Sequence, residues 1–178
     1  MTVHRLHLLG SPVLRERSAE VPAVDDATRQ LIADLFETMV AAKGVGLAAN
    51  QIGVARRVAV VEADGHRLVL VNPVILETEG RETAEEGCLS IPELYADVTR
   101  PFRVVAEALN ELGQLVRIEQ EGLPARAIQH EIDHLDGILF IDHLGPMKRR
   151  MLMNRWKREH PAEEGFIREI KPASAGSG

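Results

Sequence analysis

Apolar residues recur with a helical period near the start of the chain. Six of them lie at steps of one and three, on one face of a helix with about 3.6 residues per turn: Leu31, Ile32, Leu35, Phe36, Met39 and Val40. Asp25 and Asp26 precede this run, and Gly44 follows it in a position that a helix C-cap favours. The pattern therefore predicts an N-terminal helix that Gly44 ends.

The middle of the chain shows short runs of β-forming residues instead. The first three runs are 58–61, 67–71 and 74–77. Turn signals separate them at 63–65, 72–73 and 79–80. Two more runs, 103–108 and 115–119, flank residues 110–113 and predict a hairpin.

Two further helices are predicted in the second half. One begins near Leu123 and Pro124, because proline suits the first helical turn, and ends at Gly137. Its inward side chains are expected to be Ala125, Ile128, Ile132 and Leu135. The other spans about 146–160, and the Ser-, Gly- and Ala-rich end of the chain is expected to be flexible. A helix, several strands and two more helices predict an α+β fold.

Composition narrows the class of protein. The chain has 178 residues, 45% of them hydrophobic and only 3% aromatic, so Leu, Ile, Val and Ala must build the core of one domain. These values exclude a disordered chain, a disulfide-rich miniprotein and a collagen-like fibre. No apolar run reaches the roughly 18 residues of a membrane span, and none near residue 1 fits a signal peptide. The single cysteine, Cys88, agrees with a reducing compartment, so we expect a soluble cytoplasmic protein.

Charge is distributed unevenly along the chain. The formal net charge is −6, yet residues 147–160 hold six Lys or Arg against Glu159 alone, a local charge of +5 that leaves −11 on the remainder. A basic segment on an acidic body indicates a local anionic partner rather than general binding to nucleic acids. A solvated helix face is the alternative, and the charges alone favour it.

The strongest chemical signal is His130-Glu131-Ile132-Asp133-His134 on the second predicted helix. Histidines four residues apart project from one helix face, so both imidazoles can reach one metal ion. A glutamate beside the first histidine can then contact a water molecule at that ion. Two surface histidines beside a surface glutamate are the alternative.

A catalytic metal needs a third protein ligand, and the residues leave several candidates. The third histidine of metzincin-type peptidases would fall at Phe140, and His143 comes three residues too late. A thermolysin-like glutamate would have to be one of Glu159, Glu163 and Glu164, with no supporting motif. Cys88 is the remaining candidate, in a stretch where Gly87 permits close backbone approach and Pro92 closes the run.

A third segment, residues 44–53, contains three glycines and two alanines. It could form a narrow wall along which the backbone of a ligand lies. It lacks the spacing of a phosphate-binding loop.

Taken together, these segments resemble the peptide deformylase family of bacterial type. The stretches 44–51, 86–90 and 129–134 look like the three motifs of that family, in the same order and spacing. Residues 9–14 look like its opening, and the resemblance covers about residues 5 to 160. It implies short antiparallel strands packed around a central metal-binding helix, with an N-terminal and a C-terminal helix. Residues 1–165 would form one catalytic domain, followed by a flexible tail over 166–178.

The resemblance also implies a reaction centre. Three side chains would hold one divalent metal ion: Cys88, His130 and His134. The native ion would be Fe2+, with Zn2+, Ni2+ or Co2+ able to substitute. Glu131 would accept a proton from water and deliver it to the leaving amine, while the Gln51 amide and the Leu89 N–H stabilise the oxyanion.

The implied substrate is an N-formylmethionyl nascent peptide, which loses formate. Its backbone would pair with Val45 and Gly46, and its methionine side chain would enter a pocket lined by Leu123, Ala127 and His130. Pro124 departs from the aliphatic residue that the family more often has there, which puts this pocket edge in doubt.

The resemblance further implies a supporting ion pair between Glu86 and Arg100, although two unrelated surface charges remain the alternative. The basic helix would contact the ribosome in a protein that is monomeric and not membrane-bound. Packing of Met151, Leu152 and Trp156 on the core is an equal explanation of that helix.

Two other functions remain open. A general zinc peptidase on the same helix would cleave unformylated peptides and tolerate Cys88→Ser. A non-catalytic metal-binding or ribosome-associated module would need the three ligands but not Glu131.

Overall fold

The computed structural model describes residues 2–161, 167–168 and 170. Its helices are α1 (Asp26–Ala41), α2 (Gly122–Leu135) and α3 (Pro146–Glu159), with 3-10 turns η1 (Pro12–Arg15), η2 (Ala49–Ile52) and η3 (Phe140–His143). Its strands are β1 (Leu6–His7), β2 (Gly46–Ala48), β3 (Val58–Ala63), β4 (His66–Glu79), β5 (Glu82–Cys88), β6 (Ile91–Arg100), β7 (Arg103–Leu109), β8 (Leu115–Glu121) and β9 (Ile167–Arg168). The expected α+β class is confirmed.

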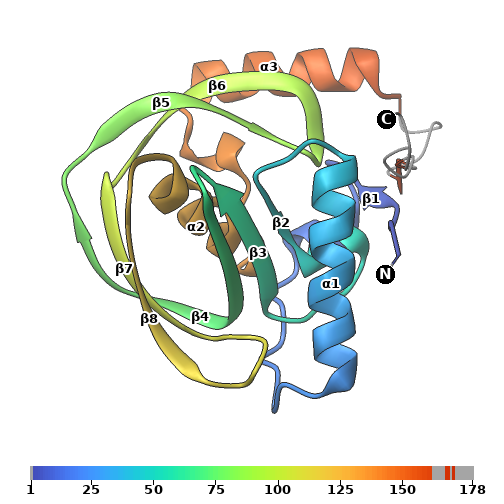
Figure 1. Cartoon of the computed structure of the whole chain (residues 1–178). Helices are drawn as coiled ribbons and strands as arrows, with labels where there is room; N and C mark the ends of the chain where they lie inside the picture. Colours follow the sequence, from blue (N-terminus) through green and yellow to red (C-terminus); the bar gives the residue numbers. More distant parts are fainter. Residues whose placement is uncertain (1, 162–166, 169, 171–178) are drawn as a thin grey trace, which may run out of the picture.

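A five-stranded antiparallel sheet in the order β2-β3-β4-β7-β8 organises the chain. Helix α2 contacts all five strands and lies inside their curve, whereas α1 packs against β2 and β3 (Figure 1). Strand β3 is buried on both faces. Val58 and Val60 belong to the apolar cluster shared with α1, and Ala59 and Val61 belong to the cluster shared with α2. The predicted central helix is therefore confirmed.

Strands β5 and β6 form a second antiparallel sheet that wraps over one end of α2 (Figure 1). Their register pairs Glu82 with Arg100 and shifts between Glu86 and Cys88, so that Cys88 lies opposite Ile91. A β-bulge of this kind redirects side chains. Here it lies where the strand reaches His130 and His134 of α2.

The predicted N-terminal helix is confirmed, with two corrections. The Asp25 carboxylate accepts a hydrogen bond from the Thr28 N–H at 2.9 Å and caps the helix. The helix ends at Ala41, and the left-handed residue beyond it is Lys43 (φ 60°) rather than Gly44. Val40 is 55% exposed, so the buried face excludes it.

The predicted turn at Asn72 and Pro73 is wrong. Strand β4 continues through both residues, with Asn72 at φ 50° and a register shift between Val71 and Val74. Because the bulge breaks the ladder, proline loses no hydrogen bond there. The Asn72 side chain instead accepts from Val21 N–H at 2.8 Å and donates to the Val21 carbonyl at 2.9 Å.

The hairpin β7–β8 is confirmed, and α2 buries its four expected apolar residues. That helix ends at Leu135, two residues before Gly137. Gly137 has φ 76°, and a Cβ there would lie 2.7 Å from the Arg15 carbonyl oxygen. Glycine is therefore required at position 137, the second residue after the helix.

Helix α3 lies along the outside of the fold (Figure 1). Trp156 is buried, Leu152 packs against the same core cluster, and Met151 is 67% exposed. Packing thus explains two of the three apolar side chains. No helix in the described part of the chain is long and apolar enough to cross a membrane.

Most of the predicted tail, 166 and 169 and 171–178, lies outside the described residues. Within it, Ile167 and Arg168 form β9, which pairs antiparallel with β1. The division at residue 165 stays a prediction.

Candidate metal centre

Helix α2 and the end of β5 bring three metal-ligating side chains together. Nε2 of His134 lies 3.2 Å from Cys88 Sγ and 3.2 Å from His130 Nε2. All three atoms fall within 4.8 Å of one another, and the described residues contain no other such group. Ligands at tetrahedral angles around an ion, with bonds of about 2.3 Å to sulfur and about 2.0 Å to nitrogen, are about 3.3 to 3.6 Å apart. The trio therefore fits one small metal ion.

Within the described residues, the other positions considered for a third ligand do not contribute one to this group. Phe140 stacks beside the His130 ring with a centroid distance of 6.4 Å. His143 points to Asp133, with Nε2 2.8 Å from Oδ2. Glu159 pairs with Arg155 on α3, and residues 163 and 164 lie outside the described part of the chain.

The two imidazoles have opposite electrostatic surroundings. Burial lowers the pKa of His134 well below its ordinary value, which favours the neutral ring that metals bind. Burial alone would also lower the pKa of His130. Cys88, Glu86 and Glu131 outweigh this and raise the pKa of His130 well above its ordinary value, so the centre attracts positive charge.

Glu131 is the buried carboxylate beside the trio. Its Oε1 lies 3.8 Å from His130 Nε2, and its Oε2 is buried without a hydrogen-bond partner in the described residues. Burial raises the pKa of Glu131 to about 7, the range in which a carboxylate exchanges protons at neutral pH. A Cβ at residue 46 would lie 3.0 Å from Glu131 Cγ, so Gly46 gives this side chain its room.

Gln51 is held by its neighbours. Its Oε1 accepts the Ala48 N–H at 2.9 Å, which turns Nε2 toward Ser90 Oγ at 3.0 Å and Cys88 Sγ at 3.7 Å. The amide N–H donors therefore face the centre. Leu89 follows Cys88 directly, and its side chain lies where a Cβ on Gly44 would be only 2.6 Å away.

A cavity of about 490 Å³ opens onto this centre. The predicted site residues that line it are Val45, Gly46, Gln51, Glu86, Cys88, Leu89, Leu123, Ala127, His130 and Glu131. His134 and Arg100 lie behind the cavity wall, and Pro124 is not part of its lining. The structure thus gathers every predicted site residue in or directly behind one cavity.

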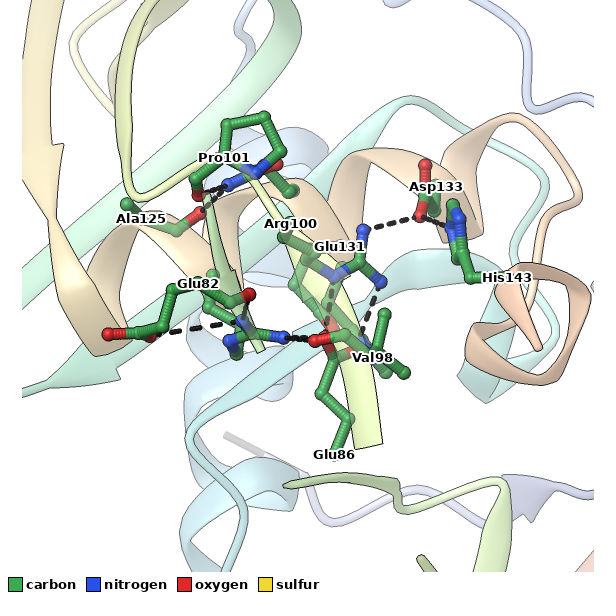
Figure 2. A network of polar contacts seen from close by, with 12 residues as sticks. Glu82, Glu86, Val98, Arg100, Pro101, Ala125, Glu131, Asp133 and His143 are labelled. Atoms are coloured by element: carbon green, nitrogen blue, oxygen red, sulfur yellow. Dashed lines mark hydrogen bonds and ion pairs between the residues drawn. The ribbon is translucent and has the colours of Figure 1, made fainter. Parts of the chain in front are cut away.

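At one side of the cavity, a buried ion-pair network surrounds Glu86 (Figure 2). Arg100 donates to Glu86 through Nε at 2.6 Å and Nη2 at 3.0 Å, and to Asp133 through Nη1 at 2.9 Å. A second partner of Glu86 is His130, whose Nδ1 lies 2.8 Å from Oε1. Burial would raise the pKa of Glu86, but hydrogen bonds from His130 and Arg100 hold it well below its ordinary value.

Sequence reasoning overlooked Arg126, which also donates to Glu86, at 2.7 Å. The available signal was its position four residues before His130, on the same helix face.

Comparisons with known proteins agree with this arrangement. A sequence model of the family described as Polypeptide deformylase matches residues 3–150. The peptide deformylase of Pseudothermotoga lettingae is 49% identical over 154 residues, which cover 86% of this chain and 89% of that protein. The crystal structure of a peptide deformylase from Legionella pneumophila superposes with a TM-score of 0.84 at 40% identity, over 89% of this chain and 95% of that one. The crystal structure of the Ehrlichia chaffeensis peptide deformylase in complex with actinonin superposes with a TM-score of 0.84 at 35% identity, over 91% of this chain and 100% of that one.

Proposed function

Because this chain belongs to the peptide deformylase family, we propose that it is a metal-dependent hydrolase acting on N-formylmethionyl peptides. It removes the formyl group from the initiator methionine of nascent polypeptides and releases formate. The observation that carries this function is the trio of Cys88, His130 and His134 with buried Glu131 at the base of one cavity.

The trio holds one divalent ion, and we propose Fe2+ as the native ion. A thiolate and two imidazoles also suit Zn2+, Ni2+ and Co2+. When bound, the ion supplies Lewis acidity and makes hydroxide available at neutral pH.

Glu131 handles the proton in this scheme. Its unpartnered Oε2 accepts a proton from the attacking water and then delivers it to the amine nitrogen as the formyl C–N bond breaks. A pKa of about 7 suits both transfers. The Gln51 amide and the Leu89 N–H donate to the formyl oxygen as it gains negative charge.

The peptide backbone lies along the outer edge of β2. This strand is the first in the sheet order, and Val45 beside it is 45% exposed, so an extended peptide can pair with Val45 and Gly46. The methionine side chain enters the part of the cavity lined by Leu123, Ala127 and His130.

We further propose that the enzyme works as a cytoplasmic monomer and contacts the ribosome through α3. Its basic side chains project outward around the buried Trp156, which supports an interaction with RNA phosphates.

The test is formate release from formyl-Met-Ala-Ser by protein purified without oxygen, with bound iron measured in the same sample. Release proportional to iron is expected, with no cleavage of the unformylated peptide. Cleavage of that peptide, unchanged in Cys88→Ser, would favour the general zinc peptidase instead. No release from folded, fully metallated protein would contradict the proposed function.

A further inference from the structure

We infer that Arg126 is a positioning residue for the metal centre: it holds Glu86 so that His130 presents Nε2 to the ion. The inference rests on the proposed function in that it concerns the same metal ligands. Arg126 belongs to none of the three motifs, and it lies on α2 one turn before His130.

The Arg126 guanidinium is buried and ties three segments together. Its Nη1 donates to Glu86 Oε2 at 2.7 Å and to the Val98 carbonyl at 2.8 Å. Its Nη2 donates to the Glu82 carbonyl at 2.7 Å. The side chain is 6% exposed, so these contacts replace the hydration of Nη1 and Nη2, whereas the buried Nε has no hydrogen-bond partner in the described residues. Arg126 therefore fixes α2 against β5 and β6, close to Cys88.

Glu86 needs this second cation because Arg100 is shared. Arg100 binds both oxygens of Glu86 with Nε and Nη2, and gives Nη1 to Asp133 (Figure 2). With Arg126 present, two guanidinium groups serve Glu86 and Asp133, and Arg126 Nη2 also lies 3.8 Å from the partly exposed Glu82 carboxylate. Without it, one guanidinium would serve two carboxylates in a poorly hydrated region, which is costly.

The position of Glu86 decides the orientation of His130. Its Oε1 lies 2.8 Å from His130 Nδ1, and a carboxylate there accepts the Nδ1–H and leaves the Nε2 lone pair for the metal. Residues that hold such a carboxylate affect metal affinity indirectly, through the carboxylate and the histidine. Losing an outer-shell partner typically weakens metal binding about 10- to 100-fold. Arg126 also lines the cavity, but its hydrogen bonds go to Glu86, Val98 and Glu82, so it acts on the metal ligands through Glu86.

Three variants test the inference in the full chain, with Co2+ titration of the apoprotein as the readout. Arg126→Met keeps an unbranched stem without charge, and we expect about 10- to 100-fold weaker Co2+ binding. Arg126→Lys keeps the charge and should recover most of that loss. Arg57→Met is the matched control. Arg57 is also buried and bonds to the end of α2, at the Leu135 carbonyl (3.0 Å) and Asp136 (2.9 Å), away from Glu86.

The control should lose stability in urea and keep its Co2+ affinity. Wild-type affinity in Arg126→Met, or no recovery in Arg126→Lys, would overturn the inference. Should the methionine variant not fold, Arg126→Gln undergoes the same titration with the same expectation. Because the readout is metal binding, a protein that releases no formate but shows this pattern would contradict the proposed function alone.

Discussion

Helices α2 and α3 have the same length and opposite surroundings. Each has 14 residues, of which ten are buried in α2 and only Trp156 is buried in α3. Both carry several charged side chains. On α2 a charge without a partner is costly, so Arg126 and Asp133 find bonded partners and Glu131 has a raised pKa. On α3 the charges stay hydrated, and each one contributes little by itself.

Replacing one glutamate on each helix should sharpen this comparison most. Glu131→Gln removes the proton acceptor, and we expect formate release to fall about 10²- to 10⁴-fold with metal content unchanged. Glu159→Gln on α3 removes only an exposed pair with Arg155 and should leave turnover at the wild-type level. Formate release and bound metal are measured on the same samples. Retained activity in Glu131→Gln would remove that residue from the mechanism.

Apolar truncations test the same contrast in folding stability. Ile128→Ala on α2 creates a cavity beneath the sheet and should cost about 2 to 5 kcal/mol of unfolding free energy. Trp156→Ala should cost about 3 to 5 kcal/mol, because this side chain anchors α3 in the core. Met151→Ala, at an exposed position, should change stability by less than about 0.5 kcal/mol.

Urea unfolding of the three variants provides these values. A loss below about 1 kcal/mol in Trp156→Ala would mean that α3 is held by its polar contacts, well short of the cost of emptying a core position.

The same contrast explains what could be predicted from sequence. Local signals sufficed for α1, the β7–β8 hairpin and the histidine pair, because each depends on residues close in sequence. The turn predicted at Asn72 was wrong because contacts with Val21, 51 residues away, support a bulge there. Strands β5 and β6 carry few apolar residues on a regular period, and Arg126 on α2, distant in sequence, bonds to both of them.

Cys88 illustrates the limit within the site. Residue types alone left several third ligands open, and only the resemblance to a family selected this one. The decisive physical fact, a thiol 3.2 Å from His134, arises from packing between segments 46 residues apart. Arg126 was predictable in principle from helix periodicity, but its partner Glu86 was not.

Asp142 couples the region of α3 to the body of the fold and gives a pH-dependent prediction. Burial would raise the pKa of Asp142, but hydrogen bonds from Arg15 and the Leu139 N–H, with the charge of Arg149, lower it below its ordinary value. Its contribution is therefore present above the ordinary carboxyl pKa of about 4 and is lost as the pH falls through the lower folded value. Asp142→Asn should cost about 1 to 2 kcal/mol at pH 7 and less at pH 3, where protonation of the folded carboxyl begins to remove the contribution.

Urea unfolding at the two pH values measures this difference. An equal loss at both would mean that the carboxylate charge contributes nothing and that only side-chain packing was disturbed.

The smallest effects on activity and stability are expected from the exposed charges of α3. Ribosome binding tests whether those charges act together. Changing Lys148, Arg150 and Lys157 to Gln should leave formate release from free peptides unchanged and alter stability by less than about 0.5 kcal/mol per residue. Ribosome co-sedimentation should weaken, and its logarithmic salt slope should fall by about 2 to 3.

A matched set, Arg17, Arg56 and Arg81 changed to Gln, removes three exposed charges elsewhere and should leave the slope in place. Since long-range attraction depends on where charges cluster, equal losses in both sets would indicate a general effect of net charge. An unchanged salt slope in the α3 set would mean that the charges of this helix only face solvent, while Trp156 anchors the helix to the core.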